Sequence, residues 1–260
     1  MTQADWNPGN YARYADLRLR PALDLLARVP ALPDGAAFDL GCGNGVVGAM
    51  LRRRFEERRL VGVDNSPAML EQARATGSYD AVVEADIADW TASEPAALIY
   101  SNAALHWLTG QESLLPRLVW ALLPGGTLAV QVPHQNNAPS HRIWLSIADE
   151  LFPGRVDHRD LPAVMRPAEY HHLLSPLGQF DLWETEYYQL LPPSNQGHPV
   201  RRFSESTYAR PILQALKSDE QTQLISAYEE VIAKAYPAAR DGSVLFPFRR
   251  MFFTLTRAAG

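Results

Sequence analysis

Polar side chains follow four short apolar segments in the first half of the sequence. Asp39 stands at the end of the first segment, just before a glycine-rich loop at 41–45. Asp64 ends the second segment, and Asp86 and Asn102 follow the third and the fourth. Alternate glycines let a backbone turn sharply and approach a ligand, and carboxylates accept hydrogen bonds from hydroxyl and amino groups. This pattern predicts a site for a small ligand that carries such groups.

Taken alone, the loop fits two cofactors. Residues 43–48 read Gly-Asn-Gly-Val-Val-Gly, which satisfies the dinucleotide-binding pattern, and Asp64 lies near the expected place of the acid that binds a ribose. Asp39 favours S-adenosyl-L-methionine instead, because a carboxylate there would repel a pyrophosphate but attracts an ammonium group. In that case Asp64 accepts the ribose hydroxyls, and Asp86 with Ile87 binds the adenine.

The segments that carry these residues alternate between strand and helix patterns. Short apolar runs predict strands, and longer segments that begin with Pro or Ser predict helices. We expect strands at 36–40, 60–64, 80–85, 96–101 and 127–132, and helices from residue 20 and at 45–55, 67–75 and 114–123. This order predicts an α/β fold with a mostly parallel seven-stranded sheet and helices on both of its faces.

The second half adds two insertions to this core. Residues 133–166 and 192–248 are expected to form a helical substrate lid, with a helix at 219–235 that starts at a capping box of Ser218 and Gln221. A helix at 167–174 and strands at 180–191 and 250–256 complete the core. We expect a single domain over 1–260: an N-terminal lid and helix at 1–30, a cofactor-binding core at 31–132, the two insertions, and the remaining core at 167–191 and 249–260.

Composition and charge narrow the class of partner. The net charge of -5 disfavours nucleic acid, and neither a long apolar run nor a signal peptide is recognisable. We therefore expect a cytoplasmic monomer or weak dimer that does not bind membranes. The lone Cys42 and the scattered histidines lack metal-ligand spacing. The arginines at 52–54 and 58–59 are expected to be solvated, because Glu56 and Glu57 lie between them.

The order of glycine loop and strand-end residues resembles that of the Rossmann-like class I methyltransferases. The resemblance implies S-adenosyl-L-methionine as cofactor, with S-adenosyl-L-homocysteine as product, and places Asn102 at the methionine end. The candidate cofactor-binding residues are Asp39, Gly41, Cys42, Gly43, Asn44, Gly45, Asp64, Asn65, Met69, Asp86, Ile87, Asn102, Trp6 and Tyr11.

A closer resemblance covers most of the chain. It begins with Trp-Asn-Pro-Gly-Asn-Tyr at 6–11 and includes Ser-Asn-Ala-Ala-Leu-His-Trp-Leu at 101–108 and Phe-Pro-Phe-Arg-Arg-Met-Phe at 246–252. These motifs are similar to those of the trans-aconitate 2-methyltransferase family, which forms a methyl ester on a carboxylate of a small polycarboxylate. The resemblance also implies that Trp6 and Tyr11 belong to a lid over the cofactor. The chain departs from the family at His134, Tyr208 and Arg249.

A carboxylate acceptor determines which residues the site needs. It is ionised at pH 7 and requires no general base, so the protein would act by positioning. Arginine forks suit the remaining carboxylates. The candidate substrate-binding residues are Arg18, Arg20, His106, Trp107, Tyr170, Arg210 and Arg250.

Other acceptors and other classes remain open at this point. A malonyl thioester on a carrier protein is a second carboxylate substrate. A natural-product hydroxyl is a third acceptor, with His134 as the base. A nicotinamide-dependent oxidoreductase or a non-catalytic cofactor-binding module would use the same glycine loop differently.

Overall fold

The computed structural model describes residues 15–162 and 164–258, so Trp6 and Tyr11 lie outside the described residues. The chain divides into two compact units. Of the described residues, unit 1 contains 15–132, 165–184 and 251–258, and unit 2 contains 133–162, 164 and 185–250. Most of the two expected insertions, 133–166 and 192–248, falls in unit 2.

A seven-stranded sheet confirms the predicted fold class. Its strands are β1 (Ala36–Leu40), β2 (Leu60–Asp64), β3 (Ala81–Glu84), β4 (Ala96–Asn102), β5 (Leu122–Pro133), β6 (Gly178–Leu191) and β7 (Val244–Arg257). The strand order is β3-β2-β1-β4-β5-β7-β6. The first five strands of this order pair in parallel, with Asp39 beside Gly62 on one side and Tyr100 on the other. The carboxyl ends of these parallel strands therefore meet at one edge.

Strand β7 runs against the parallel part. The His134 amide donates to the Arg249 carbonyl, and the hydroxyls of Thr127 and Thr256 lie 3.4 Å apart, so β5 and β7 pair in opposite directions. Strands β5 and β7 both begin earlier than the sequence predicts. Their backbone pairing continues through residues that carry no strong strand pattern.

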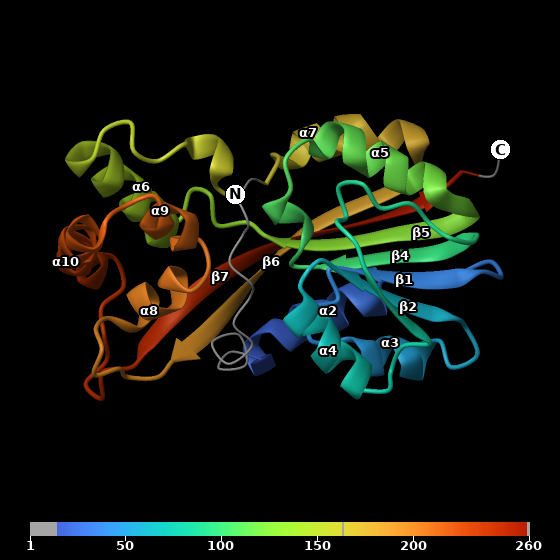
Figure 1. Cartoon of the computed structure of the whole chain (residues 1–260), viewed down its shortest axis with the longest axis horizontal. Helices are drawn as coiled ribbons and strands as arrows, with labels where there is room; N and C mark the ends of the chain where they lie inside the picture. The colour runs from blue at the N-terminus through green and yellow to red at the C-terminus, as the bar shows by residue number, and fades with distance from the viewer. Residues whose placement is uncertain (1–14, 163, 259–260) are drawn as a thin grey trace. The chain divides into compact units, whose positions relative to one another are not determined.

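The helices of unit 1 cover both faces of its sheet. They are α2 (Ala15–Ala27), α3 (Gly48–Arg54), α4 (Pro67–Ala75), α5 (Gln111–Ala121) and α7 (Pro167–Leu174), with short turns η1 (Leu105–Trp107) and η3 (Ser175–Leu177). Figure 1 shows α5 and α7 on one face, with α2, α3 and α4 on the other. Ser66 is the N-cap of α4, since its hydroxyl accepts the Met69 amide at 3.3 Å.

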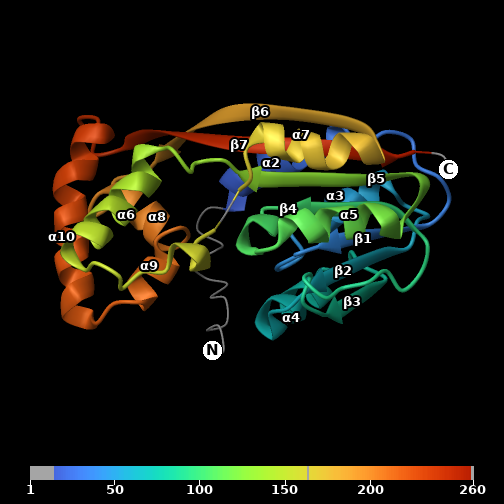
Figure 2. The same ribbon diagram turned by 90° about the horizontal axis from the view of Figure 1, so that it is seen from above.

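Unit 2 is a helical unit with its own aromatic core. Its helices are α6 (Pro139–Leu151), α8 (Pro199–Glu205), α9 (Arg210–Gln214) and α10 (Ser218–Ala235), with the short turn η2 (His158–Asp160). Figure 2 shows α10 beside α6, with α8 and α9 close by. The rings of Trp144 and Tyr228 stack with centroids 3.8 Å apart, and the Trp144 indole donates to the Ser204 hydroxyl at 2.8 Å. These contacts join α6, α8 and α10.

The predicted capping box at the start of α10 is wrong. The Glu220 carboxylate accepts the Lys217 amide at 2.8 Å, so the helix begins one residue earlier, at Ser218. The side-chain Nε2 of Gln221 instead donates to the Leu213 carbonyl at 2.8 Å. The Gln221 side chain, which the sequence pattern assigns to the cap, therefore binds the Leu213 carbonyl of the preceding segment.

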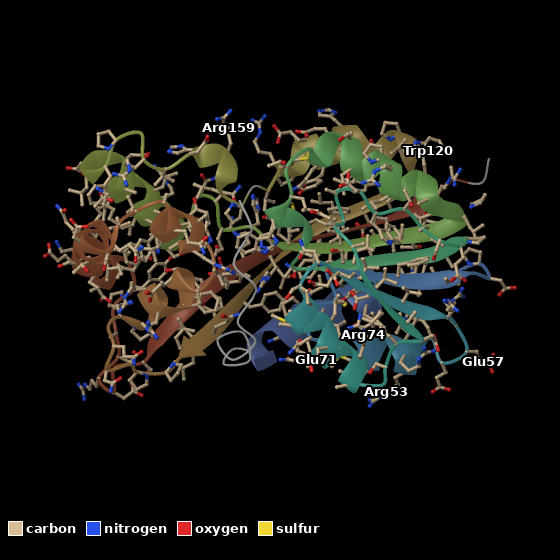
Figure 3. All side chains as sticks on the ribbon, in the orientation of Figure 1. Arg53, Glu57, Glu71, Arg74, Trp120 and Arg159 are labelled. Atoms are coloured by element: carbon tan, nitrogen blue, oxygen red, sulfur yellow. The ribbon has the colours of Figure 1, made fainter. Side chains whose placement is uncertain are left out.

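The prediction of a solvated basic run at the end of α3 is wrong for Arg52 and Arg58, which are half-buried, while Arg54 is exposed. Arg52 donates to the Arg58 carbonyl at 2.9 Å, and Arg54 donates to the Val29 carbonyl at 2.7 Å. Arg53 is exposed, and its side chain points away from the sheet in Figure 3. Most of these cations therefore satisfy backbone carbonyls in the loops of unit 1. None of the helices in 15–162 and 164–258 is long and apolar enough to cross a membrane.

Candidate functional site

The glycine loop after β1 is shaped by three left-handed backbone conformations. Gly41, Gly43 and Gly45 have φ values of 75°, 54° and 79°. A methyl group at Gly41 would lie 2.2 Å from the Ala104 Cβ, and one at Gly45 would lie 2.9 Å from the Ala73 Cα. At Gly43 nothing lies within 4 Å of such a group. Two glycines therefore permit close packing, and Gly43 borders open space.

Asp64 ties this loop to the end of β2. Its carboxylate accepts the Gly43 amide at 2.9 Å and the Ser66 amide at 3.0 Å. The amides of Gly41 and Cys42 both donate to the Val63 carbonyl, at 2.8 and 3.0 Å. These bonds place the Asp64 carboxylate at the junction of the glycine loop and β2.

Asp39 is more deeply buried than we expected for a carboxylate that binds a ligand. Only 2% of it is exposed, and it accepts a hydrogen bond from the Tyr79 hydroxyl at 2.7 Å. Burial raises the pKa of Asp39, the Tyr79 hydrogen bond lowers it, and the nearby Asp64 carboxylate raises it, so that the pKa is about 7. Sequence reasoning missed Tyr79, which no motif marks.

Cys42 fills the loop from inside. Its thiol is buried and lies 3.7 Å from the Gly43 carbonyl. Burial raises the pKa of the Cys42 thiol well above its ordinary value, and the carboxylates of Asp39 and Asp64 add to this. The Cys42 side chain therefore packs in the interior, and the backbone amide of Cys42 forms the hydrogen bond that fixes the loop.

An arginine from α5 forms hydrogen bonds with the backbone of the segment after β3. Asp86 is exposed and accepts the Ala88 amide at 2.8 Å, while Ile87 is buried. Arg117 donates to the Ile87 carbonyl at 3.3 Å and also to the Ala88 carbonyl. These bonds fix the backbone from which Asp86 and Ile87 would meet a ligand.

The end of β4 carries two features typical of a binding site. The Asn102 Oδ1 atom is buried and accepts no hydrogen bond from the described residues. Ala103, the next residue, has a φ of 56°, which is unusual for a residue with a side chain. Its amide donates to the Gln131 carbonyl at 2.9 Å. Strain of this kind persists where the surrounding structure fixes it, often beside a ligand.

Three other predicted cofactor residues lie on the same elements. Asn44 is half-buried in the glycine loop, Asn65 is exposed after β2, and Met69 is buried in α4. The hydrogen bonds of Asp64 and the packing of Ala104 on Gly41 bring the ends of β1, β2 and β4 together.

Among the predicted substrate residues of unit 1, His106 and Trp107 lie in η1. Their rings are 4.9 Å apart, and His106 is buried. Arg20 is exposed on α2. Arg18 is also in α2, and its side chain lies outside the described part of the structure.

Tyr170 is placed in the core of unit 1, which argues against a substrate role. Only 1% of it is exposed, and its hydroxyl donates to the Gln111 side chain at 2.7 Å. Its ring packs on Phe253 at 5.1 Å. Because these contacts join α7 to α5 and β7, we remove Tyr170 from the candidate site. An apolar run around a tyrosine does not reveal where its hydroxyl points.

Unit 2 contains the remaining candidates. His134 follows β5 and is half-buried, and Arg210 begins α9. Arg250 is only 4% exposed, with its guanidinium 4.3 Å from the centroid of the Phe248 ring. Of these two arginine candidates, Arg250 is deeply buried and Arg210 is half-buried.

Comparisons with known proteins identify the family. Residues 37–126 match the family model described as a methyltransferase domain. A curated trans-aconitate 2-methyltransferase from Sinorhizobium fredii is 41% identical, covering 98% of this chain and 99% of the relative. One from Streptomyces coelicolor is 40% identical, covering 100% of this chain and 89% of the relative.

Solved structures agree on the fold. The YcgJ protein of Bacillus subtilis has a TM-score of 0.59 at 12% identity, over 93% of this chain and 100% of that one. Phosphoethanolamine N-methyltransferase 2 of Haemonchus contortus, in complex with S-adenosyl-L-methionine, has a TM-score of 0.53 at 16% identity, over 92% and 53%. The chain therefore belongs to the trans-aconitate 2-methyltransferase family of Rossmann-like, S-adenosylmethionine-dependent methyltransferases.

Proposed function

We propose that this protein transfers the methyl group of S-adenosyl-L-methionine to a carboxylate of trans-aconitate or a related small polycarboxylate. The products are a methyl ester and S-adenosyl-L-homocysteine. The observation that carries the proposal is the full-length similarity to curated trans-aconitate 2-methyltransferases, which extends through unit 2 as well as the glycine loop. The malonyl thioester, natural-product and nicotinamide alternatives have no comparable support.

The residues at the strand ends fit this cofactor. The space beside Gly43 admits a ligand at the loop, and the buried Asn102 Oδ1 is an acceptor whose desolvation a donor group of the ligand would offset. We assign the ribose hydroxyls to Asp64 and the adenine to Asp86 with Ile87. The ammonium group is assigned to Asp39.

The proposed reaction requires no general acid or general base from the protein. When bound, the cofactor supplies an electrophilic methyl group on a positively charged sulfur. A carboxylate acceptor is already ionised at pH 7, so no residue has to remove a proton from it. The residues of this chain therefore bind, orient and exclude water, and no catalytic base is assigned.

We assign the remaining carboxylates of the substrate to arginines of unit 2. Replacing Arg210 or Arg250 with alanine is expected to raise the KM for trans-aconitate by at least about tenfold, since each removes a charge-assisted hydrogen bond. The Kd for the cofactor should stay within about twofold, because no described cofactor residue is changed. Steady-state kinetics and calorimetry measure the two quantities.

The matched control is Arg240→Ala, which removes an exposed arginine of the same unit. It should leave both constants unchanged. An unchanged KM in the Arg210 and Arg250 variants would remove those residues from the site.

Turnover with a labelled methyl donor tests the proposed function. Trans-aconitate, cis-aconitate, citrate and itaconate are offered in parallel, and we expect the fastest transfer to trans-aconitate. Absence of transfer to all four acids would contradict the proposal and favour a hydroxyl acceptor with His134 as base.

Several expectations stay predictions. They are a lid formed by the N-terminal residues and the two insertions, the cytoplasmic location, and the monomeric or weakly dimeric state. A small-molecule substrate is consistent with the names of the curated relatives.

A further inference from the structure

We propose that Tyr79 is a positioning residue for the cofactor: its hydroxyl holds the Asp39 carboxylate in the orientation that receives the ligand's ammonium group. The inference rests on the proposed function, in which Asp39 binds that group. Tyr79 lies between α4 and β3, 40 positions along the chain from Asp39, and its hydroxyl donates to Asp39 Oδ2 at 2.7 Å. No other described side chain or amide donates to this carboxylate.

The ring of Tyr79 packs against two glycines, where any side chain would collide with it or crowd it. A methyl group at Gly48 would lie 2.6 Å from the ring and 2.8 Å from its hydroxyl. One at Gly62 would lie 3.1 Å from the ring and the same distance from the Cys42 thiol. The ring also packs against the core cluster that contains Leu70. The chain therefore leaves room on α3 and β2 for this one aromatic side chain.

The backbone on both sides of Tyr79 is fixed by α3 and β2. Arg52 Nε donates to the Ser78 carbonyl at 3.1 Å, and its guanidinium also pairs with the Asp80 carboxylate. That carboxylate accepts the Leu60 amide at 2.7 Å. With the residues before and after it held, Tyr79 has little freedom to withdraw its hydroxyl from Asp39.

The charged and titratable surroundings of Asp39 give this contact an electrostatic role. Asp64 faces it from β2, Cys42 from the glycine loop, Tyr79 from the turn before β3 and Tyr100 from β4, and Arg74 of α4 acts on Cys42. Burial raises the pKa of Asp39 to about 7, and the Tyr79 hydrogen bond is the interaction that opposes this rise. Without the hydroxyl, the pKa of Asp39 would therefore rise further.

The pH dependence of binding follows with a definite sign. An ammonium group binds the ionised carboxylate, so affinity should be constant well above pH 7 and fall as the pH drops through about 7 and Asp39 takes up a proton. In Tyr79→Phe the fall should begin at a higher pH. The ligand's own amine titrates equally with both proteins, so the ratio of their Kd values isolates Asp39.

Calorimetric titration with S-adenosyl-L-homocysteine between pH 6 and pH 9 tests this on the full chain. For Tyr79→Phe we expect a Kd about tenfold higher than wild type at pH 6, and within about twofold at pH 9, corresponding to a shift of about one pH unit. Tyr188→Phe, which removes an exposed hydroxyl from β6, is the control and should follow wild type. A loss of equal size at every pH, or an unchanged profile, would overturn the inference.

Two further variants keep the test independent of how Tyr79→Phe folds. Gly48→Ala, which should displace the ring while leaving its hydroxyl and Asp39 in the chain, is expected to produce the same upward shift. In an Asp39→Asn background Tyr79→Phe should have no further effect on Kd, since the titrating group is gone. An additional loss there would contradict the coupling. Failure of wild type to bind at any pH would instead overturn the proposed function, and this inference with it.

Discussion

Replacing Gly43 with alanine should weaken cofactor binding by at least about a hundredfold while the protein remains folded. The φ of Gly43 is 54°, and a residue with a side chain in this conformation costs about 1 to 2 kcal/mol. The new methyl group meets no protein atom within 4 Å, so it projects into the space assigned to the ligand. Overpacking a close contact of this kind is costly. Calorimetry and thermal unfolding measure the two effects separately.

Gly125→Ala is the matched control for this substitution. Gly125 has a φ of 78° and likewise has nothing within 4 Å of an added methyl group, but it lies at the start of β5 rather than in the glycine loop. We expect the same loss of stability and an unchanged Kd. Equal cofactor affinity in the two variants would show that the space beside Gly43 is not the binding site.

The second large effect is expected for Asp64→Ala. Loss of the carboxylate removes the proposed acceptor of two ribose hydroxyls, each contributing about 1.5 to 3 kcal/mol as a hydrogen bond to a charged group. It also leaves the amides of Gly43 and Ser66 without the bonds that tie the glycine loop to β2. We predict a Kd for the cofactor that is raised by about two to three orders of magnitude.

Asp241→Ala controls for the loss of a local turn. Asp241 accepts the amide of Ser243 at 3.0 Å, the same two-residue pattern that joins Asp64 to Ser66, but it lies in unit 2. Its removal should lower stability slightly and leave the Kd unchanged. If Asp64→Ala binds the cofactor as tightly as Asp241→Ala does, the ribose assignment is wrong.

That the proposed cofactor residues lie at one edge of the sheet was predictable from the sequence for a physical reason. Parallel strands bring their carboxyl ends to one edge, so residues such as Asp39, Asp64 and Asn102 come together once the strands are recognised. The glycine loop also has a local cause, since its left-handed conformations depend on residue type.

Other parts of the site depend on long-range contacts that no short pattern contains. The Tyr79 hydroxyl reaches Asp39 of β1 over the neighbouring strand β2, because Gly48 and Gly62 leave space for the ring. Tyr170 is directed into the core by Gln111, far from it in sequence. Strand β7 begins in unit 2, where the apolar pattern does not mark its start. In each case the partner, rather than the residue's own neighbours, decides its role.

The most direct test of the central claim is a calorimetric comparison of S-adenosyl-L-methionine and NAD on the full chain. The aspartate before the glycine loop and the acceptor at the end of β4 predict specific binding of S-adenosyl-L-methionine, and no binding of NAD at the same concentrations. Tighter binding of NAD than of S-adenosyl-L-methionine would contradict the account.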